Sequence, residues 1–184
     1  KKTGGKMHGF QIWVNLPAKK KMMAPRYQEI SEQDSPTIEK NGVWARVIAG
    51  ECMGVSSSID TVIPITLIHI RMKEGTQLIQ QLDSGLNSMI YVFSGNVTIP
   101  RETSVRTHPQ IFGLGVKQSI NDGELGLFSE GEKIVINSNM SSEFLILAGP
   151  ELNEPIARYG PFVMNTREEI QQAFFDYQNG TLGN

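Results

Sequence analysis

The chain has 184 residues, with 17 Lys or Arg and 19 Asp or Glu, so its formal net charge is −2. This balance argues against strong direct binding to a nucleic-acid backbone. The hydrophobic fraction is 39%, and no apolar run is long enough to cross a bilayer, so no membrane association is expected. A single cysteine, Cys52, excludes an internal disulfide and is typical of a reducing compartment such as the cytosol or nucleus.

The first strand pattern covers Gly9–Leu16, where apolar and polar side chains alternate with period two. This alternation predicts a half-buried strand that ends at Pro17. The chain does not begin with Met, and Lys1–Lys6 leads straight into this segment, so we expect a truncated or processed start. Residues 25–42 are rich in Pro, Ser, Asp and Glu without periodicity, which predicts an inter-domain linker.

From Val43 onward, short strand patterns alternate with Gly and Pro turns. The predicted strands are Val43–Ile48, Ile65–Met72, Met89–Phe93, Val97–Ile99, Leu125–Phe128, Lys133–Ile136 and Phe144–Leu147. In the second of these, Ile68, Ile70 and Met72 share one face, and His69 lies on the other. Many short strands at regular spacing predict an antiparallel barrel or jelly roll.

One helix is predicted after Asn165 or Thr166, either of which can cap it, with Glu168 or Glu169 completing a capping box. Its apolar stripe is expected to lie on the barrel, and it consists of Ile170, Ala173, Phe174 and Tyr177. The sequence therefore predicts an all-β protein with a C-terminal helix.

Residues suited to catalysis are few. His8, His69 and His108 are far apart in sequence, and none stands at metal-ligand spacing from another His or from a Glu. We interpret His69 as a packed or rim histidine, His108 as an exposed loop residue, and His8 as a turn or capping residue. Cys52 has no His or basic neighbour in sequence, which predicts a buried, unreactive thiol.

Two stretches carry a specific family resemblance. His8–Pro17 (HGFQIWVNLP), continued by Pro25–Gln28 (PRYQ), closely resembles the segment that joins the two halves of pirins. Tyr159–Thr166 (YGPFVMNT), preceded by Gly149-Pro150, resembles the end of the pirin C-terminal domain. The match extends over nearly the whole chain, so the sequence is identified as the C-terminal two-thirds of a pirin or pirin-like protein.

The resemblance implies a bicupin, in which two double-stranded β-helix barrels face each other. Residues 1–24 would then be the last strand or strands of the first barrel, 25–42 the linker, and 43–184 the C-terminal cupin with its helix. The spacing of the cupin metal motifs maps onto this second barrel, but at positions without imidazoles: Gly75, Gln81, Asp83, Ser88, Gly95, Gly131, Asn137, Asn139 and Ser142.

This set of side chains is too weak to hold Fe(II), so the second barrel resembles a degenerate cupin without metal or catalytic residues. If the motif alignment holds, Gln81, Asp83, Ser88 and Ser142 point into the interior and hold water or a small polar ligand. In pirins, three histidines and a glutamate of the first barrel bind the iron. The resemblance places all four before Lys1, so no cofactor is expected in this chain and Fe(II) is expected in the full-length protein.

The resemblance implies two functions. The first is an iron-dependent transcriptional co-regulator of the nucleus and cytoplasm, which contacts a transcription-factor complex as a protein partner without binding nucleic acid directly. The alternative is an enzyme, quercetin 2,3-dioxygenase, with this chain alone inactive. A third reading is a scaffold that has lost its own site. Because the first barrel is incomplete here, the apolar face of Gly9–Leu16 is expected to be covered by another chain, as in self-association, or to pack on the second barrel.

Overall fold

The computed structural model describes residues 4–5, 7–100, 105–106, 119–128 and 131–183, so His108 lies outside the described residues. Contacts divide the chain into two units. Tyr27–Glu151 is named the barrel unit. Lys1–Arg26 and Leu152–Asn184, the two ends of the chain, together form the terminal unit.

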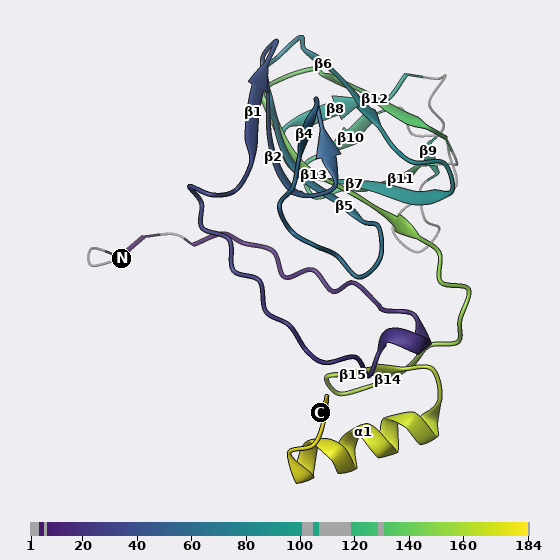
Figure 1. Ribbon diagram of the computed structural model, residues 1–184. Coiled ribbons are helices and arrows are strands. Elements are labelled where there is room, and N and C mark those ends of the chain that lie inside the picture. The colour runs from purple at the N-terminus through teal and green to yellow at the C-terminus, as the bar shows by residue number, and fades with distance from the viewer. Residues whose placement is uncertain (1–3, 6, 101–104, 107–118, 129–130, 184) are drawn as a thin grey trace. The chain divides into compact units, whose positions relative to one another are not determined.

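The described strands of the barrel unit form two main antiparallel sheets and one small hairpin (Figure 1). The large sheet has the order β1 (Thr37–Lys40), β2 (Val43–Ala49), β5 (Thr66–Met72), β13 (Ser142–Pro150), β7 (Leu86–Ser94), β11 (Leu125–Phe128), β9 (Val105–Arg106). The small sheet has the order β10 (Ser119–Asn121), β8 (Asn96–Thr98), β12 (Lys133–Ser138), β6 (Gln77–Gln81). The hairpin pairs β3 (Glu51–Cys52) with β4 (Val55–Ser56).

Side chains alternate between the interior and the outside along these strands. In β2, β5 and β12 every second residue is buried, and most of the buried positions hold Val, Ile or Ala. Ile68, Ile70 and Met72 face inward as predicted, since their exposed fractions are 0%, 0% and 3%. Strands with one apolar face bury it by packing on a second sheet.

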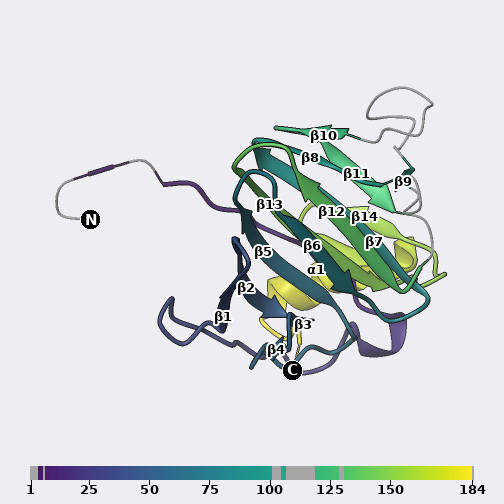
Figure 2. The same ribbon diagram turned by 90° about the horizontal axis from the view of Figure 1, so that it is seen from above.

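One apolar core fills the barrel unit, and strands of both main sheets contribute to it. Figure 2 gives a second view of the strands that enclose this core. Among its members, Ile90, Phe144 and Ile146 come from the large sheet and Ile136 from the small one, all with no exposed surface. The predicted all-β cupin class with a C-terminal helix is confirmed.

The terminal unit contains a short 3-10 helix (Ala18–Lys20), a hairpin of β14 (Ala157–Tyr159) and β15 (Phe162–Met164), and helix α1 (Arg167–Asn179). The predicted capping box is formed, because the Thr166 side chain accepts from the backbone N–H of Glu169, whose carboxylate accepts in turn from the Thr166 backbone. Gly180 ends the helix in the left-handed conformation.

Helix α1 packs on the hairpin of its own unit, although its apolar stripe was expected to lie on the barrel. Ile170 and Ala173 are buried beside Phe162, whose ring meets Phe174 edge-on at 4.8 Å. Tyr177, the last member of the predicted stripe, remains 66% exposed. No helix in the described part of the chain combines the length and apolar character needed to cross a membrane.

The strand predicted over Gly9–Leu16 is not formed, although its alternating pattern is clear. A strand needs a neighbour to complete its backbone hydrogen bonds, and residues 7–16 pair with no strand of the described chain. Phe10, Ile12 and Val14 are 43%, 37% and 48% exposed, so their expected burial is absent in the single chain. That another chain covers them, and that residues 1–24 belong to a preceding barrel, stay predictions.

The predicted linker over residues 25–42 is largely part of the barrel unit. Strand β1 pairs with β2 in register from Thr37 opposite Arg46 to Lys40 opposite Val43. Earlier in the segment, the Gln28 amide donates to the Asp60 carbonyl at 2.8 Å and accepts from the Asp60 N–H at 3.1 Å. Sequence polarity suggested a spacer, but polar residues are equally compatible with an exposed edge strand.

Two glycines at the cupin-motif positions adopt positive φ, and their surroundings differ. Gly95 has φ +85°, and a Cβ there would lie 2.5 Å from both the Ser141 carbonyl oxygen and the Ser142 hydroxyl. Gly75 has φ +74° with nothing within 4 Å of such a Cβ. Gly95 is therefore required by both backbone conformation and space, and Gly75 by conformation alone.

We predict that Gly95→Ala lowers the free energy of unfolding by about 3 kcal/mol, because left-handed strain adds to overpacking against backbone. Gly75→Ala, the matched control, should cost about 1 kcal/mol, since only the strain remains. Urea unfolding of both variants measures the difference. Equal losses at the two positions would contradict the role of close packing at Gly95.

Candidate functional site

Strand β6 carries positions of the first predicted cupin motif. Its inward-facing side chains are displaced by one residue from the ones that the motif spacing predicted. Leu78 and Gln80 are the buried side chains of this strand, while Gln81 is exposed. Beyond the strand, Leu82 packs against the core and Asp83 is exposed. The expectation that Gln81 and Asp83 point inward is therefore wrong, because period two places Gln80 and Leu82 on the inner side.

Three other polar motif positions, Asn137, Asn139 and Ser142, are engaged in structural hydrogen bonds. Ser88 and Ser142 are buried as expected, at 6% and 4% exposure. The Ser142 hydroxyl accepts from the Asn96 backbone N–H at 3.0 Å, and the Asn139 amide donates to the Asn96 side-chain oxygen. The Asn137 side-chain oxygen accepts from the Gln77 amide at 2.8 Å on the exposed side of the sheet. Gly131 is exposed between β11 and β12.

The structure thus distributes the predicted positions over separate parts of the barrel unit. Gly95, Asn139 and Ser142 surround Asn96. Gln81 and Asp83 lie at the edge of a pocket lined also by residues of the β3–β4 hairpin. Their identification as degenerate motif positions stays a prediction, but they do not converge on one point as metal ligands must.

An Fe(II) ion does not fit the donors that this barrel offers. The inward positions of the ligand strand hold a carboxamide and an isobutyl group, and Ile68, Ile90 and Ile136 occupy the interior with no exposed surface. Fe(II) sites of the cupin type need several imidazole or carboxylate ligands with open positions. Among the described residues, no group of three or more His, Cys, Asp or Glu could hold a metal ion.

The pocket beside β6 has a volume of about 580 Å³. One wall is Gln80, whose side-chain NH₂ donates to the carbonyl oxygens of Glu51 at 2.9 Å and Gln81 at 2.7 Å. Its oxygen, Oε1, is buried and has no hydrogen-bond partner in the described chain. Cys52 lines the same pocket and is 1% exposed, which confirms the predicted buried thiol. Burial, and then the charge of Glu51, raises the pKa of Cys52 to about 11, so this thiol stays protonated.

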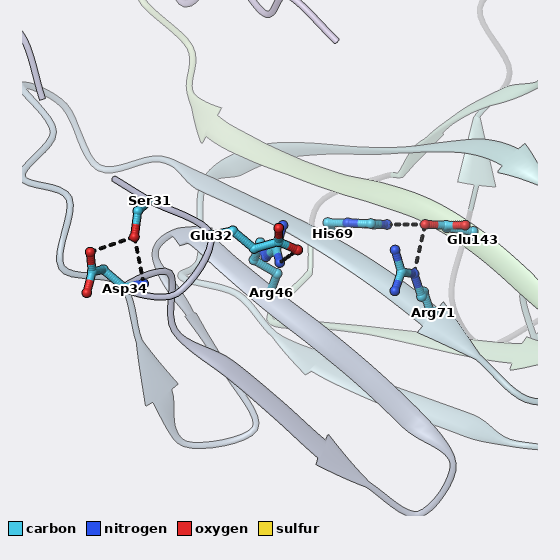
Figure 3. A network of polar contacts seen from close by, with 7 residues as sticks. All are labelled: Ser31, Glu32, Asp34, Arg46, His69, Arg71 and Glu143. Atoms are coloured by element: carbon cyan, nitrogen blue, oxygen red, sulfur yellow. Dashed lines mark hydrogen bonds and ion pairs between the residues drawn. The ribbon is translucent and has the colours of Figure 1, made fainter. Parts of the chain in front are cut away.

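A second polar group lies on the outer face of the large sheet, where β5 and β13 are neighbours (Figure 3). Nε2 of His69 lies 2.6 Å from Oε1 of Glu143, and Arg71 Nε donates to the same oxygen at 2.9 Å. The Arg71 guanidinium carbon lies 4.5 Å from the centroid of the Trp44 ring, and the Trp44 and His69 rings meet edge-on with their centroids 5.3 Å apart. The ring of Phe93, on β7, has its centroid 5.7 Å from that of the same imidazole.

This arrangement holds His69 neutral. Burial lowers its pKa below the usual 6.5, assisted by the charges of Arg71 and Arg46, and the hydrogen bond to Glu143 opposes the shift without cancelling it. Burial raises the pKa of Glu143, but hydrogen bonds from Arg71 and His69 outweigh it, so the net shift is downward. A neutral imidazole meets a carboxylate only as a donor, so its proton sits on Nε2. The site matches the predicted packed histidine.

Gln80 and the contact between Trp44 and Arg71 were not predicted from the sequence. The alternation Leu78, Gln80, Leu82 could have identified Gln80 as inward, since it places a polar residue between two apolar ones on one face. The stacking of Trp44 and Arg71 depends on the pairing of β2 with β5, which puts these two residues opposite each other.

Comparison with known proteins gives concordant matches. The pirin C-terminal cupin domain family matches residues 67–183. Pirin of Mus musculus is 35% identical over 178 residues, which cover 96% of this chain and 57% of the mouse protein. A pirin-like protein of Solanum lycopersicum is 36% identical over 182 residues, or 97% of this chain and 58% of the tomato protein. The chain therefore spans less than 60% of the length of these two relatives.

Solved structures agree with these matches. The crystal structure of a quercetin 2,3-dioxygenase from Acinetobacter baumannii superposes with a TM-score of 0.77 and 31% identity. The superposition covers 94% of this chain and 56% of that protein.

We predict that the His69 imidazole titrates by NMR with a midpoint below 6.5, and that Glu143→Gln lowers this midpoint further, because the carboxylate is the group that raises the pKa. A His69→Gln variant assigns the signal. Because the unfolded chain binds the proton more readily, the stabilisation from His69 is complete above pH 6.5 and is lost as the pH falls through the folded-state pKa. A midpoint that rises in Glu143→Gln would contradict the assigned proton position.

Proposed function

Since this chain belongs to the pirin family, we propose that it forms the metal-free barrel of a two-barrel protein whose full-length form is an iron-dependent quercetin 2,3-dioxygenase. The observation that carries the proposal is the inner side of β6 and of the residue after it, where Leu78, Gln80 and Leu82 occupy the segment that holds the metal ligands in a metal-binding cupin. A barrel filled in this way contributes packing surface, not reaction chemistry.

The choice of an oxygenase rests on similarity over most of the chain. The solved structure with a TM-score of 0.77 is a quercetin 2,3-dioxygenase, and at 31% identity the likeness extends beyond the fold. In this proposal the iron is bound by the barrel that precedes residues 8–17, through the three histidines and one glutamate that the family resemblance implies. The barrel unit then supports that iron-binding barrel and takes no part in binding oxygen or flavonol.

A second candidate is an iron-dependent transcriptional co-regulator that acts in the nucleus and cytoplasm by contacting a transcription-factor complex. It is supported by 35% identity to mouse pirin and by the outer face of the large sheet, where the half-buried Trp44 lies beside Arg71, whose side chain is 58% exposed. The net charge of −2 favours a protein partner over direct contact with DNA. Exposed Phe10, Ile12 and Val14 support self-association when the first barrel is incomplete.

The test is quercetin turnover by the full-length protein, with oxygen consumption as the readout. We expect turnover with Fe(II), its loss after chelation, and its recovery when Fe(II) is restored. His69→Gln in this chain should leave kcat/KM within about twofold, since a change far from the reacting atoms removes no transition-state contact. Absence of turnover, with a metal-dependent pull-down of the transcription-factor complex, would favour the co-regulator.

Elemental analysis separates the two barrels. We expect the 184-residue chain alone to hold no stoichiometric iron after reconstitution with Fe(II), because its inward donors do not fit that ion. The full-length protein, treated in parallel, should hold one iron per chain. One iron bound to the shorter chain would overturn the assignment of this barrel as metal-free.

A further inference from the structure

The two ends of the chain are joined in the terminal unit through one carboxylate. Leu152–Asn184, which we call the C-terminal segment, clusters with Lys1–Arg26 and not with the barrel unit. Its residue Glu154 accepts from the Ala18 backbone N–H at 2.7 Å and from the Asn165 side-chain NH₂ at 3.1 Å. One side chain therefore ties the start of the C-terminal segment to a residue 136 positions earlier in the sequence.

The stretch before Ala18 has the pattern of a strand without a strand beside it. Residues 11–16 alternate in side-chain character, yet they belong to no strand in the described part of the chain. The guanidinium carbon of Arg158, in the C-terminal hairpin, lies 5.5 Å from the centroid of the Trp13 ring, whereas Ile12 and Val14 are exposed. Backbone groups and an apolar face in this state are satisfied when the stretch joins a sheet.

The terminal unit buries too little apolar surface to be stable by itself. Its buried apolar side chains among the described residues are Phe162, Ile170 and Ala173. Tyr159 of the hairpin and Phe175 of the helix remain exposed. A unit with so small a core needs a further body to pack on, and exposed aromatic side chains are typical of the surface that makes such a contact.

The chain that precedes residue 8 is the body that fits best. Strands consecutive in sequence are neighbours in a sheet in about two-thirds of cases, so the strands on either side of residues 11–16 are the first candidates. The strand that follows, β1, already pairs with β2 in the barrel unit, which leaves the preceding chain. The match covers 57% of mouse pirin, and the family matched over residues 67–183 is a C-terminal domain, so the relatives have enough further chain for a preceding barrel.

We infer that the C-terminal segment is a structural part of the preceding barrel: residues 11–16 extend a sheet of that barrel, and the hairpin with helix α1 packs against it. This differs from the assignment of residues 152–184 to the second cupin, which followed their linear order in the chain. The inference rests on the proposed two-barrel protein, but not on its activity. The competing partners are the barrel unit and a second copy of the chain.

Hydrogen–deuterium exchange of the full-length protein, read by mass spectrometry, tests the inference. Glu154→Ala removes both hydrogen bonds of the carboxylate. We expect peptides that precede residue 8, and the peptide over residues 11–16, to exchange about tenfold faster, because a lost hydrogen bond to a charged group lowers the free energy of local opening. Peptides within residues 43–151 should keep their rates. Glu151→Ala, the same change at an exposed position of the barrel unit, is the matched control and should alter no rate.

A second pair of variants keeps the test decisive if Glu154→Ala fails to fold. Arg158→Gln removes the contact with the Trp13 ring from an exposed position and should accelerate exchange before residue 8 by about twofold. Arg167→Gln, at the exposed start of helix α1, is its control and should have no such effect.

Three outcomes would overturn the inference. They are faster exchange confined to residues 152–184, faster exchange in residues 43–151 without a change before residue 8, and protection of residues 11–16 that increases with protein concentration. The second would assign the C-terminal segment to the barrel unit, and the third would assign the surface to a second copy. Quercetin turnover of the same wild-type sample reports separately on the proposed function, since the expected exchange pattern without turnover would contradict the dioxygenase alone.

Discussion

The pairing of β13 on both sides is the constraint on which the barrel unit depends. This strand runs antiparallel to β5 along one edge and to β7 along the other, so it joins the two halves of the large sheet. Its inner side supplies Phe144 and Ile146, which have no exposed surface. A register shift against β7 falls between Glu143 and Phe144, and the extra residue lies on β7. In β13 itself Glu143 alternates with the buried Ser142 and Phe144, so it faces outward, toward His69 and Arg71.

The same strand begins at the place where the cupin framework is most tightly constrained. Ser142 bonds to the backbone of Asn96, directly after the glycine whose close approach leaves no room for a Cβ. A hydroxyl in this position satisfies backbone groups at the junction of the two sheets, whereas an imidazole would have to point into an interior already filled by isoleucines. A core filled by isoleucines therefore leaves no room for converging metal ligands among the described residues of this barrel.

Most of the barrel could be predicted from the sequence, since strands such as β2 and β7 alternate and are followed by a glycine, and the helix carries its own capping box. Three features could not be predicted in this way, for physical reasons. The alternating pattern over Gly9–Leu16 shows which side chains share an apolar face. It does not show which strand this segment would pair with or what would cover that face. The spacing of Gly75 and Gly95 locates the cupin motif to within about one residue. An error of one residue in the alignment assigns every side chain in β6 to the wrong face. The Trp44, His69 and Glu143 cluster joins three strands distant in sequence, so only the sheet order reveals it.

The division into units has a consequence for the order of folding. Residues 27–151 stand in sequence between the two halves of the terminal unit, so the barrel is an insertion within a discontinuous unit. During synthesis the segment 1–26 emerges first, yet it must wait for 152–184 before contacts such as that between the Ala18 N–H and Glu154 can form. The contacts of the terminal unit are therefore long-range in sequence, and closing them costs more chain entropy than a local contact would.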